Sequence, residues 1–163
     1  ASGKPFMLFL SFWGPHAPYL VPEPYASMYD PARVKLWENF RDDLAGKPRV
    51  QDRFRRAVSR YPRVSDSAWR DRIAKYWGFC SFIDDEIGRL LNVLKELGRE
   101  DDTAVFLSTD HGDMTGSHGG ITDKGPFMYH ETYHIPLIAR VPGVTTAGAV
   151  CSMPSARVGP AGR

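Results

Sequence analysis

Residues 103–113 read Thr-Ala-Val-Phe-Leu-Ser-Thr-Asp-His-Gly-Asp, an apolar run that ends abruptly in polar residues and a glycine. Such a run predicts a buried β-strand over 103–109. Asp110 and His111 follow this strand directly, and the ends of strands in α/β sheets are where ligands gather. A carboxylate and an adjacent imidazole can both reach one divalent cation. The stretch indicates a candidate metal site, with a hydrogen-bonded histidine in a simple turn as the alternative.

A helical pattern precedes this strand. Apolar side chains recur at three- and four-residue spacing from Trp69 to Leu94, Asp66 or Ser67 can cap the start, and Gly98 follows the end. We predict one long helix here, tied to its neighbours by Asp84 and Asp85. A helix, a short connection and an apolar strand are together typical of an α/β layered domain.

Two further apolar runs flank these elements. Residues 5–13 are almost continuously apolar, which predicts a strand buried on both faces of a parallel sheet. Residues 135–141 predict another strand near an edge, because Pro136 cannot donate a ladder hydrogen bond. Residues 20–67 are polar and rich in proline, so we expect an irregular excursion with short helices around 32–44 and 50–60. Residues 144–163 lack periodicity and predict a poorly ordered tail.

Charge is distributed unevenly along the chain. The net charge is +2, yet the segment from Arg33 to Lys75 holds 13 basic and 6 acidic residues, a local charge of +7. Such a segment can steer anionic substrates or bind nucleic acid. No recognised nucleic-acid motif accompanies it, so a solvated face is the favoured interpretation and no nucleic-acid partner is expected. No apolar run reaches the roughly 20 residues that a membrane-spanning helix needs.

His16 and Lys124 are the candidate anion-binding residues. His16 stands between Pro15 and Pro18 at the end of the apolar run over 5–13, and Lys124 follows Asp110 by fourteen residues and precedes Gly125-Pro126. An imidazole and an ammonium held near a metal would bind the oxygens of a sulfate or phosphate ester. Taken singly, His16 is more typical of a hydrogen-bonded residue in a turn, and Lys124 of an ordinary surface lysine.

The combination of these motifs resembles the sulfatase family of the alkaline phosphatase superfamily, over residues 4–143. Five stretches carry the resemblance: Phe-Leu-Ser-Phe-Trp-Gly-Pro-His-Ala-Pro-Tyr (9–19), Phe-Ile-Asp-Asp-Glu-Ile-Gly-Arg-Leu-Leu (82–91), Ser-Thr-Asp-His-Gly-Asp-Met-Thr-Gly-Ser-His-Gly (108–119), Asp-Lys-Gly-Pro-Phe-Met-Tyr-His-Glu (123–131) and Ile-Pro-Leu-Ile-Ala-Arg-Val-Pro-Gly (135–143). Their order and spacing match the family, which makes the set far more specific than any one stretch.

The resemblance implies an alkaline-phosphatase-like α/β/α sandwich with a mostly parallel sheet, incomplete here, in which residues 1–143 form part of a catalytic domain. It implies that Asp110 and His111 bind a divalent metal, usually calcium and sometimes magnesium or manganese. It also implies that His16 and Lys124 contact the sulfuryl group of a small-molecule sulfate monoester. Asp113 and His118 belong to the same motif and are assigned to loop structure. There are two alternatives. One is a phosphonate or phosphate ester hydrolase, and the other is a non-catalytic remnant that binds a metal or an anion.

One part of the family pattern is missing from these residues. The family nucleophile is a cysteine or serine in C/S-x-P-S-R, accompanied by paired acidic metal ligands, and neither occurs in the 163 residues. We therefore expect an internal fragment of a longer enzyme that is inactive on its own, because covalent catalysis needs a nucleophile beside the metal. The start of the chain shows no signal peptide, which leaves the compartment of the parent protein open.

Overall fold

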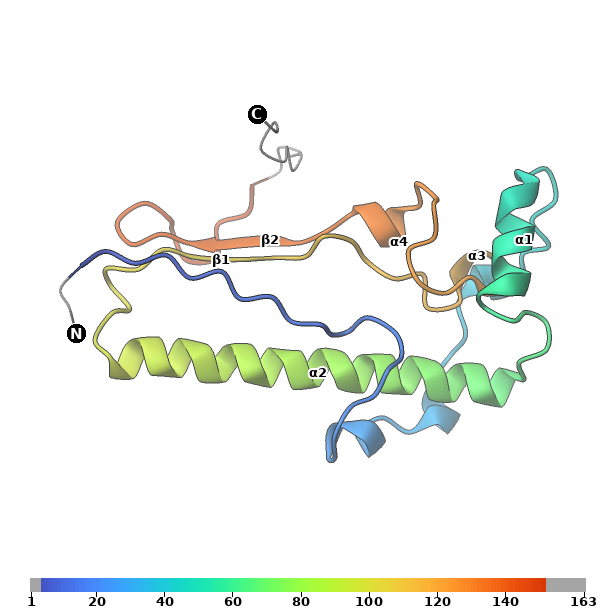
Figure 1. Cartoon of the computed structure of the whole chain (residues 1–163), viewed down its shortest axis with the longest axis horizontal. Helices are drawn as coiled ribbons and strands as arrows, with labels where there is room; N and C mark the ends of the chain where they lie inside the picture. Colours follow the sequence, from blue (N-terminus) through green and yellow to red (C-terminus); the bar gives the residue numbers. More distant parts are fainter. Residues whose placement is uncertain (1–3, 152–163) are drawn as a thin grey trace.

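One long helix spans the molecule in the computed structural model, which describes residues 4–151 (Figure 1). This helix is α2, Asp66–Glu96, and it confirms the helix predicted for this segment. Its cap lies just before the predicted one: the Ser65 hydroxyl accepts a hydrogen bond from the backbone N–H of Ala68 at 3.2 Å. Gly98 ends the helix in the left-handed region, with φ +65°. No described helix is both long and apolar enough to cross a membrane.

Two short strands lie beside α2. They are β1, Val105–Ser108, and β2, Leu137–Arg140, and they confirm the strands predicted within 103–109 and 135–141. The strands pair antiparallel, with Val105 opposite Arg140 and Ser108 opposite Leu137. Among residues 4–151 this pair is the whole sheet, so the predicted parallel pairing is not seen between the described strands.

The predicted burial of the strands is wrong for the chain as it stands. Residues 5–13 have no regular secondary structure, and the Met7 side chain is 93% exposed. Phe106 in β1 is 65% exposed. A strand of this composition is buried when strands pair with both its edges and helices cover its faces, and the described residues supply β1 with β2 alone. We call residues 6–13, β1 and β2 together the apolar strand region.

The irregular segment over 20–67 is built from short helices. It contains η1, Tyr25–Ser27, η2, Pro31–Arg33, η3, Glu38–Arg41, and α1, Arg49–Ala57. The helix expected around 50–60 is therefore present as α1, whereas the one expected around 32–44 is replaced by two 3-10 helices. Two helical turns follow β1: α3, Ser117–Gly120, and α4, His130–Tyr133.

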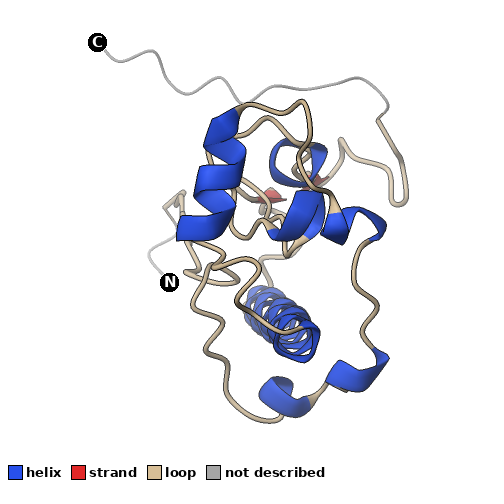
Figure 2. Cartoon of the chain, turned by 90° about the vertical axis from the view of Figure 1, so that its right-hand side faces the viewer, coloured by secondary structure: helices blue, strands red, loops and turns tan. Residues whose placement is uncertain are grey.

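The core lies around the first half of α2, which Figure 2 shows nearly end-on among the short helices and loops. Trp69 of α2 is fully buried, and its ring meets that of Phe40 edge to face at 5.4 Å. One cluster joins α2 to η2 and a second joins α1 to the segment after β1, and their buried members are Val34, Ile73, Ala74, Met114, Ile121 and Phe127.

The Tyr25 hydroxyl of η1 donates a hydrogen bond to Asp85 of α2 at 2.5 Å, which confirms a tie predicted for that carboxylate. Residues 144–151 form no helix or strand. The remainder of the predicted tail, 152–163, lies outside the described residues.

Candidate functional site

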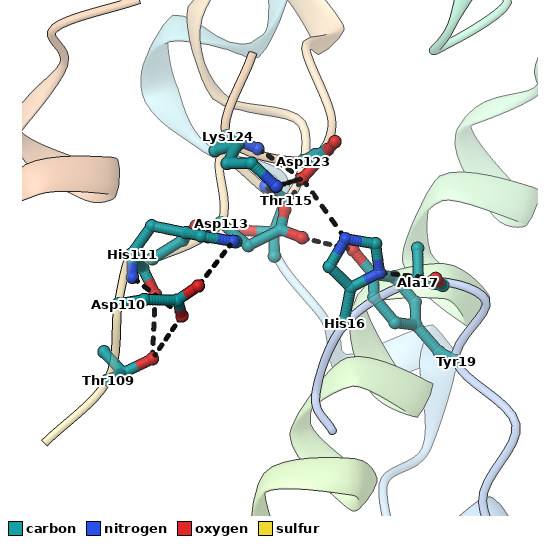
Figure 3. Close-up of polar contacts among 11 residues, drawn as sticks. His16, Ala17, Tyr19, Thr109, Asp110, His111, Asp113, Thr115, Asp123 and Lys124 are labelled. Carbon is teal, nitrogen blue, oxygen red and sulfur yellow. Dashed lines mark hydrogen bonds and ion pairs between the residues drawn. The ribbon is translucent and has the colours of Figure 1, made fainter. Parts of the chain in front are cut away.

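The four predicted site residues lie in two loops that approach one another (Figure 3). His16 lies in the turn that ends the N-terminal segment, while Asp110, His111 and Lys124 lie on the segment that follows β1. The ring centroids of His16 and His111 are 6.2 Å apart. Folding therefore brings His16 beside the Asp110–His111 pair, from a distant part of the sequence.

Asp110 and His111 present two metal-binding atoms toward the same space. The Oδ2 atom of Asp110 and the Nε2 atom of His111 are 3.6 Å apart. Nδ1 of His111 lies 2.8 Å from the carbonyl oxygen of Gly112. A carbonyl can only accept, so Nδ1 carries the proton and Nε2 keeps the lone pair that a metal ligand needs.

The pKa of Asp110 also suits a cation ligand. Partial burial raises this pKa, but hydrogen bonds from the backbone N–H groups of Asp110 and His111, together with the neighbouring His111 ring, outweigh it. The net pKa of Asp110 is lowered, and its side chain is 78% exposed. The carboxylate is thus charged and open to solvent at neutral pH.

His16 and Lys124 lie on either side of a carboxylate that the sequence did not single out. The Oδ1 atom of Asp123 is 4.0 Å from Nε2 of His16 and 3.7 Å from Nζ of Lys124. Both distances exceed hydrogen-bonding range, so these are loose contacts that an incoming anion can replace. The only signal for Asp123 in the sequence is its position directly before Lys124.

Asp113 joins the two loops. Its Oδ2 atom accepts a hydrogen bond from the Tyr19 hydroxyl at 2.9 Å, close in sequence to His16. Its Oδ1 atom accepts from the backbone N–H groups of Thr115, at 2.7 Å, and Asp123, at 3.1 Å. Burial raises the pKa of the Asp113 carboxyl, although these hydrogen bonds favour its charged form. All three partners belong to loops, in agreement with the structural role predicted for Asp113.

Gly112 and His118 hold the other side of the loop against α4. A Cβ atom on Gly112 would overlap the carbonyl oxygen of Glu131, and the Gly112 N–H donates to the Thr132 carbonyl at 3.0 Å. Nε2 of His118 lies 2.9 Å from Oε1 of Glu131, and the His118 ring stacks on Tyr129 at 3.7 Å. Glycine at position 112 thus lets the chain turn immediately after the two candidate metal ligands.

These groups offer donor atoms for a cation and a positive charge for an anion. Within residues 4–151, no group of three or more His, Cys, Asp or Glu side chains is placed to hold a metal ion. Asp110 and His111 supply two donors at a separation that one cation can bridge, which fits part of a divalent-metal site but does not complete it. Nδ1 of His16 lies 2.7 Å from the carbonyl oxygen of Ala17, so Nε2 of the neutral ring keeps its lone pair, and Lys124 adds an ammonium group nearby.

The sequence is similar to those of known proteins. The family model described as Sulfatase matches residues 1–158. The chain is 36% identical over 139 residues to the sulfatase YidJ of Escherichia coli, a match that covers 85% of this chain and 27% of YidJ. It is 32% identical to an arylsulfatase of Clostridium perfringens, covering 86% of this chain and 28% of that enzyme. The chain therefore spans little more than a quarter of the length of these relatives.

The solved structure of a phosphonate monoester hydrolase from Silicibacter pomeroyi is similar to the chain with a TM-score of 0.68 and 34% identity. The match covers 79% of this chain and 27% of the hydrolase. This likeness confirms the predicted alkaline-phosphatase-like α/β fold, of which the described residues form an incomplete part.

Proposed function

The chain belongs to the sulfatase family of hydrolases, and from this premise we propose that it supplies part of the site at which its parent protein hydrolyses a sulfate monoester. The observation that carries the proposal is the convergence of His16 with Asp110, His111 and Lys124 from two separate loops. The substrate is a small molecule bearing a sulfate ester, and the residues divide into a metal pair and an anion-binding pair.

Asp110 and His111 are the metal pair. Members of the family are metal-dependent hydrolases, and we propose calcium as the ion, with magnesium or manganese as the alternatives. When bound, such a cation supplies positive charge against an ester oxygen. The charged, exposed carboxylate of Asp110 and the free lone pair on Nε2 of His111 support this role.

His16 and Lys124 are the anion-binding pair. The Lys124 ammonium carries a full charge and can donate to two sulfuryl oxygens, and His16 lies across Asp123 from it. When the ester enters, its oxygens take the place of the Asp123 carboxylate beside both groups. Charge that builds on these oxygens during reaction is then stabilised by the Lys124 ammonium, which is already in place beside them, and interactions of this kind accelerate a reaction.

A phosphonate or phosphate ester hydrolase is the second candidate. The similarity to the Silicibacter pomeroyi phosphonate monoester hydrolase favours it, and the same His16 and Lys124 side chains would serve either anion. A non-catalytic remnant that only binds the metal or the anion is the third.

Turnover by the full-length parent protein tests the proposal. With calcium present, we expect a higher kcat/KM for 4-nitrophenyl sulfate than for 4-nitrophenyl phenylphosphonate. The 163-residue chain alone is expected to show no turnover of either ester, because it contains no C/S-x-P-S-R motif. Preference for the phosphonate would favour the second candidate, and inactivity of the parent protein toward both esters would favour the binding remnant.

Replacement of Asp110 by asparagine is expected to weaken calcium binding by the chain about 10- to 100-fold, since it removes the charged ligand of a two-ligand site. Isothermal titration calorimetry of the 163-residue chain measures the change. Asp101→Asn is the matched control, because Asp101 is an exposed carboxylate outside the site. Equal calcium affinity in Asp110→Asn and Asp101→Asn would exclude Asp110 as a ligand.

A further inference from the structure

The segment around α1 carries a concentration of positive charge that the proposed site does not use. Residues 47–63 hold seven basic residues and one acidic residue, Asp52. Three arginines recur at helical spacing on α1, and all three are exposed: Arg49, Arg53 and Arg56. Positions that differ by four and seven fall on one face of a helix. These side chains therefore form one ridge, which we call the arginine ridge.

Little in the described structure neutralises this ridge. Asp52 is shared between Arg56, at 2.8 Å, and the buried Arg55, also at 2.8 Å. Within residues 4–151, the guanidinium groups of Arg49 and Arg53 have no hydrogen-bond or ion-pair partner. Three more exposed cations flank the helix: Lys47, Arg60 and Arg63. Most of the positive charge of the ridge is therefore available to interact with an anionic ligand.

The opposite face of α1 packs on the segment that carries Lys124. The Phe54 ring meets that of Phe127 edge to face at 5.3 Å, and Nη1 of Arg55 donates to the Gly119 carbonyl at 3.2 Å. The Tyr129 hydroxyl donates to Oε1 of Gln51 at 2.7 Å. Figure 1 shows α1 standing beside this segment, next to α3. The ridge is therefore about one helix diameter, roughly 10 Å, from the segment that bears the anion site.

The shape of the ridge indicates the kind of ligand. Arg49 and Arg56 are separated by about 10 Å along the helix axis, at a rise of roughly 1.5 Å per residue. Such spacing suits a series of anionic groups along a chain, rather than one small anion. The planar guanidinium fork matches the oxygens of sulfate as well as those of phosphate. Because the adjacent site is proposed to take a sulfate ester, a multiply sulfated ligand is favoured over a nucleic acid.

We propose that the arginine ridge binds neighbouring sulfate groups of a linear, multiply sulfated saccharide, one of whose sulfate esters occupies the site of His16 and Lys124. This inference rests on the proposed function and names its substrate class. The solvated face favoured from the sequence alone then becomes a substrate-binding surface. The uncompensated field of the ridge would also attract such a chain from solution at low ionic strength.

Binding of a fluorescent heparin octasaccharide to the 163-residue chain tests this proposal, by fluorescence anisotropy at several salt concentrations. The double variant Arg49→Gln/Arg53→Gln is expected to weaken binding about tenfold, since each exposed ion pair contributes about a factor of three. Its binding should also depend less steeply on salt. The control Arg89→Gln/Lys95→Gln removes the same charge from exposed positions on α2 and is expected to leave the affinity within about twofold.

Two outcomes would overturn the proposal. One is an equal loss, or no loss, of octasaccharide affinity in the ridge and control variants. The other is binding of a DNA duplex with the same number of charges at least as tightly as the octasaccharide, lost in the same ridge variant, which would make the ridge a nucleic-acid surface. The assay reads binding and not turnover. The octasaccharide can therefore fail to bind the ridge while the parent protein still hydrolyses 4-nitrophenyl sulfate. That result would reject this inference and leave the proposed function in place.

Discussion

Replacing Lys124 by alanine in the full-length parent protein is expected to lower kcat/KM for 4-nitrophenyl sulfate about 100- to 1000-fold. The ammonium group lies 3.7 Å from Asp123, in a position that an ester oxygen can take over. Alanine would leave the negative charge of Asp123 beside His16 with no lysine to balance it, so the site would repel the anion it has to bind. Initial rates over a range of ester concentrations measure the loss.

Lys95→Ala is the matched control for this experiment, because Lys95 is an exposed lysine on α2 outside the site. Its kcat/KM is expected to equal that of the unchanged protein. A loss of less than tenfold in Lys124→Ala would remove Lys124 from the anion-binding pair.

Replacing Asp113 by alanine is expected to lower the free energy of unfolding of the chain by about 3 to 5 kcal/mol. The carboxylate accepts hydrogen bonds from the backbone N–H groups of Thr115 and Asp123 and from the Tyr19 hydroxyl, so three donors would lose their partner together. Urea unfolding followed by tryptophan fluorescence measures the change. Asp101→Ala, which alters an exposed carboxylate, is expected to change the free energy by less than about 0.5 kcal/mol.

The same carboxyl group gives the unfolding free energy a defined dependence on pH. Because burial raises the pKa of Asp113, the folded chain holds this proton more tightly than the unfolded chain. The contribution of this proton to the unfolding free energy is complete below about 3.9, the pKa of Asp113 in the unfolded chain. It is lost as the pH rises through the higher pKa of Asp113 in the folded chain. The unfolding free energy of the unchanged chain, relative to that of Asp113→Asn, should therefore fall as the pH is raised from about 4. A constant or rising difference would contradict the raised pKa.

The elements that the sequence predicted well are those with a local signal. The helix α2 follows from the regular recurrence of apolar residues between Trp69 and Leu94, and Gly98 ends it as expected. The strands β1 and β2 follow from short apolar runs next to turn residues. The approach of His16 to His111 was implied by the family resemblance and lies beyond any local pattern.

The features that the sequence missed depend on distant contacts. Burial of β1 was predicted from its composition, but burial is decided by which segments cover a strand, and the described residues leave Phe106 exposed. Asp123 became part of the site only because folding places it between His16 and Lys124. Similarly, nothing in the order of residues indicates that the buried core lies with the irregular segment containing Val34 and Phe40 rather than with the strands.

The apolar strand region has a practical consequence for anyone who handles the chain in solution. Contacts between apolar surfaces are strengthened by salts such as ammonium sulfate, which are excluded from protein surfaces. Attraction of polyanions to the arginine ridge is weakened by the same salts, because ions screen exposed charges. Figure 1 shows β1 and β2 in the left half of the molecule and α1 at its right-hand end. Raising the salt concentration therefore weakens binding of polyanions to the arginine ridge but strengthens apolar association of the strand region, and an intermediate ionic strength limits both kinds of contact.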